Sequence, residues 1–245
     1  MFLNSAKFEC KHILKVLTFF TFSSFNYAYA DTFSSTIALP TIAGTGLNGS
    51  YYAFNTWPGS LANTQNLINA AGAPTATFTA TSVCFPSCNT SIGDGSTLAQ
   101  YLGANASNIS LNNITNLSEH AVVLNGYIAI TAPGSYQFSI LSDDGSQLQI
   151  GGKTIFNADG DHGFSGGTAT VQFSNSGLYK FDVLAFEDAG VTGLTVLENG
   201  NALTANQLFT SAVPEAEEWT MLMLGLCMMG WVTRSKQSVQ SITVS

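Results

Sequence analysis

Apolar and polar residues alternate in several short stretches, most clearly in the second half of the chain. Leu124, Gly126, Ile128 and Ile130 occupy every second position, and Tyr136, Phe138 and Ile140 do the same after a break. Successive side chains of a strand point to opposite faces, so this period of two predicts half-buried β-strands. Further strands are predicted at residues 46–54, 75–83, 148–150, 153–156, 170–173, 179–186 and 193–197.

Turn signals separate these stretches at Pro133-Gly134, Gly151-Gly152 and Asn199-Gly200. Glycine and asparagine tolerate the backbone angles that tight hairpins require. Short helices are predicted at residues 61–71 and 96–102. Many short strands with glycine-rich turns predict an all-β fold: a β-sandwich of mainly antiparallel strands with one or two short helices.

The N-terminus has the three parts of a secretory signal peptide. Three lysines precede an apolar run from Val16 to Phe22, and a small-residue site, Ala28-Tyr29-Ala30, follows. We therefore expect residues 1–30 to be removed by signal peptidase, with a retained N-terminal helix as the alternative. Residues 31–45 are small and polar and are expected to lead into the folded domain.

The C-terminus is segmented in the same way. Val213-Pro214-Glu215 precedes an apolar run from Trp219 to Thr233, and the end is basic. The run is shorter than the roughly 20 residues that span a bilayer. Residues 213–245 resemble the PEP-CTERM sorting signal of Gram-negative bacteria that make exopolysaccharide, although Ala216 replaces the second proline of its Pro-Glu-Pro motif. The resemblance implies transient membrane insertion, cleavage near Pro214 by an exosortase, and a secreted or cell-surface protein, outer-membrane associated in such a bacterium; a simple tail anchor is the alternative.

Charge limits the possible partners. Between Asp31 and Val213 eleven acidic residues face two lysines, Lys153 and Lys180, so this part carries a net charge of 2 − 11 = −9. An acidic surface does not attract phosphate backbones, which argues against nucleic acid. Cations and neutral polar ligands fit this balance better.

Only Cys84 and Cys88 remain between the two terminal segments. An isolated pair in a secreted chain predicts a disulfide that closes a small loop. Zinc would require further cysteine or histidine ligands nearby, and the neighbouring sequence has none.

Two adjacent carboxylates, Asp143 and Asp144, stand at a predicted strand end with almost no positive charge around them in sequence. Like charges at this spacing repel, so a shared cation is one way to keep both. Calcium accepts six to eight oxygen ligands, and Asp188 is a reasonable third donor. The alternative is an ordinary turn. Residues 157–163, which include Asp161, also space oxygen side chains at alternate positions; a solvated loop, or a wall of the Asp143 pocket, is favoured there over a second calcium site.

A series of motifs follows in a fixed order: Gly126–Ile128, Ala132–Phe138, Ser142–Ser146, Ile150–Lys153, Asn157–Gly160, Gly177–Tyr179, and Ala185–Glu187 before Gly193-Leu194. They resemble the domain first named from anthrax protective antigen, which also occurs in yeast flocculins, bacterial glycosidases and surface proteins. The resemblance runs from about Gly46 to Val196, and we assign residues 46–212 to this domain. It implies a β-sandwich that commonly binds carbohydrate.

In the adhesin members of that family, two aspartates joined by a cis peptide hold a calcium ion that sugar hydroxyls ligate. Asp143 and Asp144 match that pair. A second loop supplies an asparagine in the adhesins; here it corresponds to residues 187–192, which lack asparagine, and Asp188 could replace it. The resemblance thus implies a metal site at Asp143, Asp144 and Asp188, and a ligand site formed by Asp143, Asp144, Gly145, Glu187, Asp188 and Asp161.

Together these observations predict an exported surface or matrix protein that binds glycan or exopolysaccharide with calcium. The alternative is a structural matrix or biofilm protein in which calcium only rigidifies the fold. An enzyme is not expected, because adjacent carboxylates that share a cation are poorly placed to flank a sugar bond. Trp57 and Phe164 are candidates for stacking on sugar, although for Trp57 a place in the core is favoured.

Overall fold

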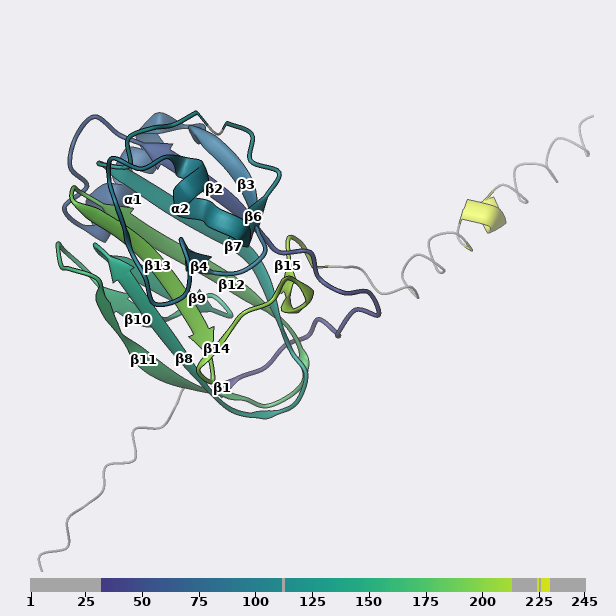
Figure 1. Cartoon of the computed structure of the whole chain (residues 1–245). Coiled ribbons are helices and arrows are strands. Elements are labelled where there is room, and N and C mark those ends of the chain that lie inside the picture. The colour runs from purple at the N-terminus through teal and green to yellow at the C-terminus, as the bar shows by residue number, and fades with distance from the viewer. Residues whose placement is uncertain (1–31, 112, 213–223, 225, 230–245) are drawn as a thin grey trace, which may run out of the picture.

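The computed structural model describes residues 32–111, 113–212, 224 and 226–229. Two β-sheets pack face to face, and the two α-helices lie toward one end of the layers (Figure 1). The predicted all-β sandwich with few short helices is confirmed.

The first sheet has seven strands. Its path runs β1 (Thr32–Phe33), β11 (Ser165–Phe173), β8 (Gly134–Asp143), β13 (Val191–Glu198) and β14 (Asn201–Ala202); β13 also pairs with β4 (Cys84–Phe85) and β5 (Ile92–Gly93). All of these pairings are antiparallel except that of β1 with β11.

The second sheet has eight strands. Its path runs β10 (Lys153–Ala158), β9 (Ser146–Ile150), β12 (Gly177–Glu187), β7 (His120–Ile130), β2 (Leu47–Ala53), β3 (Ala76–Ala80) and β6 (Ala106–Ser107), and β15 (Leu208–Phe209) pairs with β7. All of these pairings are antiparallel. The hairpin turns predicted at Gly151-Gly152 and Asn199-Gly200 join β9 to β10 and β13 to β14.

The core lies between the sheets and is built from the residues whose alternation the sequence shows. Leu124, Ile128, Phe138 and Ile140 are all essentially inaccessible to solvent. Burying a side chain of this size contributes about 1.5–3 kcal/mol. The alternation therefore marks the inward face of each strand.

The helices form where they were predicted. Helix α1 (Leu61–Ala71) begins at Ser60, whose side chain accepts a hydrogen bond from the Asn63 amide. Helix α2 (Leu98–Leu102) begins at Thr97 with a reciprocal capping box. Two short 3-10 turns complete the helical content of the described domain, η1 (Gly103–Asn105) and η2 (Ala205–Gln207).

The segment before residue 46 does more than lead into the domain. β1 pairs in parallel with β11, and Phe33 is buried against Phe173 with their ring centroids 6.0 Å apart. The Ser35 hydroxyl donates to the Leu178 carbonyl, also in the second half of the chain. The described sandwich therefore begins at residue 32.

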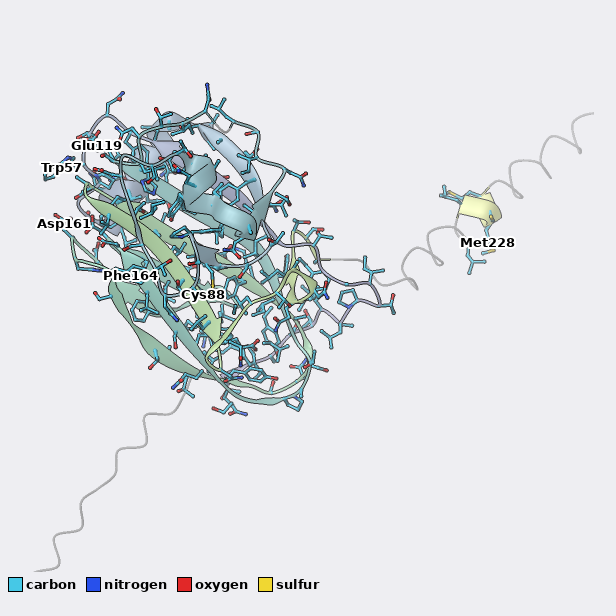
Figure 2. All side chains as sticks on the ribbon, in the orientation of Figure 1. Trp57, Cys88, Glu119, Asp161, Phe164 and Met228 are labelled. Carbon is cyan, nitrogen blue, oxygen red and sulfur yellow. A yellow bond between two sulfur atoms is a disulfide. The ribbon has the colours of Figure 1, made fainter. Side chains whose placement is uncertain are left out.

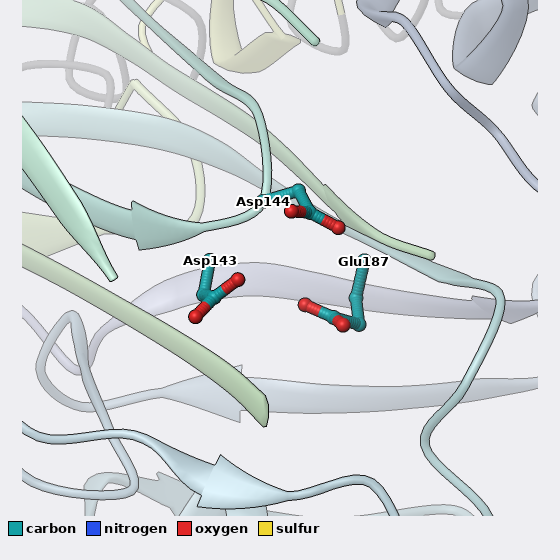
Figure 3. A group of neighbouring side chains, drawn as sticks. All are labelled: Asp143, Asp144 and Glu187. Carbon is teal, nitrogen blue, oxygen red and sulfur yellow. The ribbon is translucent and has the colours of Figure 1, made fainter. Parts of the chain in front are cut away.

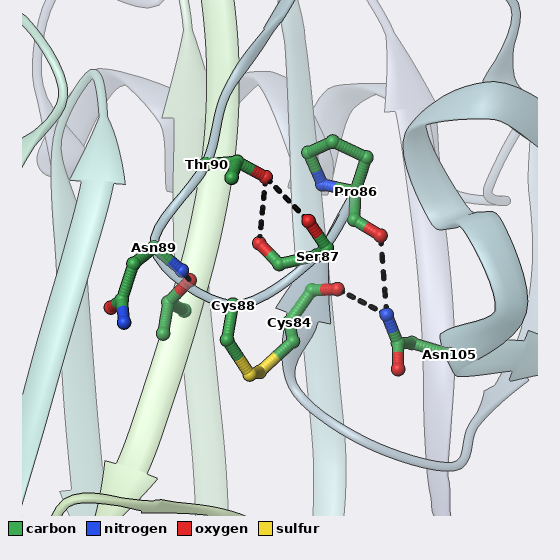
Figure 4. The surroundings of a disulfide bond; sticks show 8 residues. Cys84, Pro86, Ser87, Cys88, Asn89, Thr90 and Asn105 are labelled. Atoms are coloured by element: carbon green, nitrogen blue, oxygen red, sulfur yellow. Dashed lines mark hydrogen bonds between the residues drawn. A yellow bond between two sulfur atoms is a disulfide. The ribbon is translucent and has the colours of Figure 1, made fainter.

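Cys84 and Cys88 are joined by a disulfide, with a Cα–Cα distance of 4.4 Å (Figure 4). The loop that it closes is fixed at both sides. The Asn105 side chain donates to the carbonyls of Cys84 and Pro86, and the Asn89 amide donates to the hydroxyl of Thr195 at 3.0 Å. The disulfide thus closes a loop that the bond from Asn89 to Thr195 holds against strand β13.

The expected signal peptide, residues 1–30, and the sorting motif Val213-Pro214-Glu215 lie outside the described residues. Within the part of the chain that the structure describes, no helix has the length and apolar character needed to cross a membrane.

Candidate functional site

The turn between β8 and β9 carries Asp143 and Asp144 across from one sheet to the other. Asp143 is the last residue of β8, and β9 begins at Ser146 in the opposite sheet. The peptide bond between the two aspartates is cis, the arrangement that the family resemblance implies. Each aspartate is only 6% exposed. The turn therefore buries two adjacent carboxylates at one end of the sandwich.

Asp144 makes three hydrogen bonds, and a fourth holds Gly145 beside it. The Asp144 amide donates to the Phe186 carbonyl at 2.8 Å, and the Phe186 amide returns a bond to the Gly145 carbonyl at 2.9 Å. Its two carboxylate oxygens accept from the amides of His162 at 2.9 Å and Asp188 at 3.0 Å. Asp144 thereby ties together the turn, the end of β12 and the loop after β10.

Gly145 serves this site through its small size. A Cβ atom at this position would lie 2.4 Å from the ring of Phe186 and 3.1 Å from the carbonyl oxygen of Ala158. No side chain fits between the turn and β12. Gly145 was expected to bind ligand; its structural role is to allow this close packing, and it can contribute only backbone atoms to the site.

Glu187 completes a buried carboxylate group. It is the last residue of β12, where it pairs with His120 of β7, and its side chain is inaccessible to solvent. Asp143, Asp144 and Glu187 each place a carboxylate oxygen within 4.8 Å of the others, and the three side chains converge in Figure 3. We call these three residues the inner set.

Half of the six oxygens have no hydrogen-bond partner among the described residues: Oδ2 of Asp143 and both oxygens of Glu187 are buried and unpaired. Burial raises the pKa of Glu187 to about 9, and the negative charges of Asp144 and Asp143 add to the shift. Burial, followed by the charge of Asp144, raises the pKa of Asp143 to about 6. Unpaired buried oxygens with raised pKa values are typical of carboxylates that bind a proton or a cation.

The two lysines of the domain lie elsewhere. Lys180 forms an ion pair with Asp182 at 3.0 Å. It precedes Glu187 by seven residues on the same strand, about 23 Å along an extended chain. Lys153 follows the turn at the other end of β9 from Ser146, and its Nζ lies 5.3 Å from the ring centroid of Phe33. Neither lysine therefore neutralises the inner set.

A second carboxylate group adjoins the first. Asp144, Asp161 and Asp188 also bring their oxygens within 4.8 Å of one another, and Asp161 is exposed. We call these three residues the outer set. Burial raises the pKa of Asp188 to about 6, although the Gly59 amide donates to its Oδ1 at 3.0 Å. The expected donors Asp143, Asp144 and Asp188 are thus divided between two sets that share Asp144.

Besides Asp161, Glu187 is a possible donor that the sequence does not predict as a metal ligand. Its signal is visible afterwards: an acidic residue directly ends a strongly apolar strand, immediately before Asp188. Residues at such strand ends lie beside the turns of neighbouring strands, and β12 pairs directly with β9. The sequence alone did not show which turn Glu187 would meet.

The loop after β10 forms one wall beside Asp144, as one of the alternatives for residues 157–163 supposed. In this loop the backbone amide of His162 donates to Asp144. Oδ1 of Asp159, also in the loop, accepts from the amide of Leu61 at 2.7 Å and from that of Gly160 at 2.9 Å. Asp159 therefore helps to cap helix α1.

The loop of residues 188–190 forms another wall. Oδ2 of Asp94 accepts from the Gly190 amide at 3.1 Å and from the Ser118 hydroxyl at 2.8 Å. The hydrogen bond from Gly190, followed by that from Ser118, lowers the pKa of Asp94. Val191, the next residue after Gly190, is 44% exposed. The bond to Asp94 thus fixes the loop in place, and the side chain of Val191, directly after it, faces solvent.

The expectation that Trp57 belongs to the core is wrong, because its side chain is 61% exposed. It precedes Pro58 and Gly59 in the loop before α1, and that loop is held in place from below. The Gly59 amide binds Asp188, and the Asn63 side chain donates to the Pro58 carbonyl at 2.8 Å. These bonds keep Trp57 outside the sandwich, on the same edge of the molecule as Asp161 (Figure 2).

Phe164 and His120 are less accessible than Trp57. The ring of Phe164 packs over Gly193, where an added Cβ would lie 2.7 Å from it, and the side chain is half-buried. His120 is buried and stacked on Tyr51 with ring centroids 4.9 Å apart. Burial lowers the pKa of His120 to about 4. His120 is therefore a neutral core residue.

Comparisons with known proteins agree with this architecture. Residues 104–196 match the PA14 domain family. No curated protein matches the chain. Among solved structures, the PA14 domain of the antifreeze protein MpAFP has a TM-score of 0.61 and 22% identity over 74% of this chain and 99% of its own.

Two further structures have similar folds. The PA14 sugar-binding domain of an RTX adhesin has a TM-score of 0.57 and 23% identity, covering 69% of this chain and 99% of its own. A subtype-switched epithelial adhesin A domain from Candida glabrata, in complex with β-lactose, has a TM-score of 0.52 and 13% identity, covering 77% of this chain and 98% of its own. The described domain thus shares the β-sandwich fold of these structures, and residues 104–196 within it match the PA14 domain family.

Proposed function

We propose that this protein is an exported carbohydrate-binding protein whose glycan site depends on calcium bound at Asp143 and Asp144. The observation that carries the proposal is the inner set: three buried carboxylates that leave three of their six oxygens unpaired and that neither lysine of the domain neutralises. A divalent cation would balance this charge and occupy the free oxygens.

The donor chemistry favours calcium over other common ions. The two sets offer only carboxylate oxygens, which suit a hard cation that takes many oxygen ligands. Zinc sites normally contain histidine or cysteine. Asp143, Asp144 and Glu187 would hold the ion from inside, and Asp188 and Asp161 would define the side that faces solvent.

A glycan partner is supported by the similar structures. One of them is named a sugar-binding domain and another is in complex with β-lactose. The chemistry of this chain agrees, because an acidic domain with a central cation attracts a neutral ligand that carries hydroxyl groups more readily than an anion. We propose binding without catalysis, since the carboxylates converge on one another.

Export and surface sorting belong to the same proposal. It takes residues 1–30 as a signal peptide, residues 213–245 as a sorting segment processed by an exosortase, and exopolysaccharide as the natural glycan. These segments lie outside the described residues, so the proposal rests there on the sequence pattern alone.

One observation favours a second function. Glu187 is entirely buried, so an ion held chiefly by the inner set would lie out of reach of a sugar hydroxyl and would only rigidify the turn. In that case the sandwich is an assembly unit of an extracellular matrix or biofilm. This alternative predicts calcium binding and self-association without affinity for glycans.

The deciding experiment screens the purified full-length chain on a glycan array, once with calcium and once with a chelator. The calcium-dependent proposal expects saturable binding to a subset of sugars, lost with the chelator and lost in Asp144→Asn. Glu198→Gln, which makes the corresponding change five residues along β13 from the position that pairs with Asp143, should bind as the wild type does. Chelator-sensitive self-association without glycan binding would favour the structural alternative.

Trp57 provides a prediction about the same site. Replacing it with alanine should weaken binding of the selected sugar about five- to tenfold, because stacking between an aromatic ring and an apolar face contributes roughly 1 kcal/mol. Isothermal titration calorimetry in the presence of calcium measures the effect. Ile42→Ala is the matched control. Ile42 is equally exposed, at 61%, but it lies just before the segment that hydrogen-bonds beside β15, away from Trp57. Equal affinities for both variants would remove Trp57 from the site.

A further inference from the structure

We propose that the outer face of the eight-stranded sheet is a second glycan-binding site, which takes an extended, uncharged oligosaccharide and needs no calcium. A hollow of about 240 Å³ lies over strands β7, β9 and β12, with Gln65 of helix α1 at one side. Its floor includes the side chains of Asn125, Gln147, Gln149 and Asp182. These side chains differ from the carboxylate sets in place and in chemistry.

Strand register aligns the polar side chains of this face in a single row. Asn125 pairs with Asp182, Asp182 pairs with Gln149, and Gln149 pairs with Thr154. The row continues in the other direction through Asn48 to Thr79 and Ser107. Neighbouring strands lie about 4.8 Å apart, so these seven positions extend over about 29 Å. The row is therefore long enough for an extended oligosaccharide, and it crosses the sheet perpendicular to the strands.

Hydrogen bonds fix the amides of this row and leave part of their capacity unused. The Asn125 side chain donates to Asp182 at 3.0 Å, and the Gln149 side chain donates to Gln147 at 2.6 Å and to Thr154 at 3.3 Å. In these bonds Asn125 and Gln149 act as donors, and their amide oxygens take no part. An amide can donate and accept at once, as a sugar hydroxyl can. Pre-oriented amides thus suit a ligand rich in hydroxyl groups.

The charge of the groove singles out a neutral ligand. The domain is strongly acidic, yet the charged residues that line this hollow, Lys180 and Asp182, form an ion pair at 3.0 Å. An ion pair on a surface otherwise lined by amides and apolar side chains attracts neither polyanions nor cations strongly. Val123 and Leu184 also line the floor and offer apolar surface to the C–H face of a sugar ring.

The hollow continues toward the other end of the strands. A second hollow of about 280 Å³ shares Lys180 with the first and is lined by Tyr127, the Gly151-Gly152 turn and the segment of residues 34–37. The two hollows together form a trough, which is bounded by α1 at one end and by this N-terminal segment at the other. Leu184, the lining residue of β12 nearest to Glu187, lies three positions from it, about 10 Å along the strand and on the opposite face. The trough can therefore be occupied independently of the carboxylate sets.

The test uses the full-length Asp144→Asn variant in the presence of a chelator, so that the calcium-dependent site is disabled. Soluble linear β-glucan, α-glucan and β-galactan oligosaccharides are titrated while side-chain amide resonances are followed by NMR. We expect saturable binding that shifts the amide signals of Asn125 and Gln149. Combining Asn125→Ala with Gln149→Ala should weaken it about tenfold or more, because two hydrogen-bonding groups are lost.

The control is the pair Gln137→Ala and Gln172→Ala, which removes two amides from the outer face of the other sheet and should leave affinity unchanged. A merely solvated face gives no chelator-resistant binding to any of these oligosaccharides, and that result overturns the inference. Equal weakening in the control pair also overturns it. If the wild type shows chelator-resistant binding but no calcium-dependent component, the inference stands and the proposed calcium-dependent function fails.

Discussion

Calcium is expected to raise the melting temperature of the wild-type protein by about 5–10 °C, and Asp144→Asn should abolish that rise. A ligand that binds only the folded state stabilises it by about 2.7 kcal/mol at a hundredfold excess over its dissociation constant. For a chain of this size, each kcal/mol corresponds to about 2–4 °C. Asp144 has the largest expected effect because it is the one carboxylate shared by the inner and outer sets.

The measurement compares thermal melts with calcium and with chelator for each variant separately. This matters because Asp144→Asn also places an amide group where both carboxylate oxygens accept hydrogen bonds, so its melting temperature without calcium should already be lower. The difference made by calcium is the quantity to compare. Asp182→Asn should retain the full difference, and a wild type indifferent to calcium would eliminate the metal site.

Without calcium, the protein is expected to lose about 3 kcal/mol of stability between pH 6.5 and pH 8.5. The pKa of Glu187 is about 9 in the folded state, against 4.5 as its ordinary value. Within this window the folded state retains a proton that the unfolded chain has released. Stability must therefore fall as the pH rises, by up to about 1.4 kcal/mol per unit. Below the ordinary pKa of 4.5 the contribution of Glu187 is complete.

The lower limit of the window is set by His120. Its pKa falls to about 4 in the folded state from 6.5, so the unfolded chain binds the extra proton between these values and stability rises with pH there. Asp143, with its pKa raised to about 6, contributes a loss that overlaps that range. Above pH 6.5 the remaining effect belongs chiefly to Glu187.

Urea unfolding at several pH values, with chelator present, measures this dependence. Glu187→Gln retains the shape of the side chain but cannot titrate, so its stability should be nearly constant between pH 6.5 and 8.5. A wild-type slope that persists in Glu187→Gln would assign the effect to another group. Added calcium should flatten the wild-type slope, because a cation that replaces the proton of Glu187 stabilises the ionised form.

Local periodicity predicted most of the fold. The strands around Leu124 and Phe138, the turn at Gly151-Gly152 and helix α1 follow from residue spacing and from residues close in sequence. The strand at Thr32–Phe33 was missed because its stability comes from pairing with Gln172 and Phe173, 140 residues away. No pattern within a two-residue strand can indicate such a partner.

The site was predictable to the same limited extent. The Asp143-Asp144 turn stands out by its own chemistry, but Glu187 joins it only through the register of β12 against β9 and β7. Trp57 was placed wrongly for a related reason. Hydrophobicity favours burial of an indole, whereas the bonds from Gly59 to Asp188 and from Asn63 to Pro58 hold the loop outside.

The pairings of β1 and β15 place the first and last strands of the domain away from the end of the sandwich that carries Asp143. β1 lies beside the part of β11 that pairs with the start of β8, and β15 joins β7 near Ile128. Asp143 stands at the opposite end of β8, about 30 Å from Gly134 along the strand. If the domain is attached through the chain that follows Phe209, the carboxylates therefore lie at the end farthest from the attachment point. The outer faces of both sheets then remain accessible to other molecules.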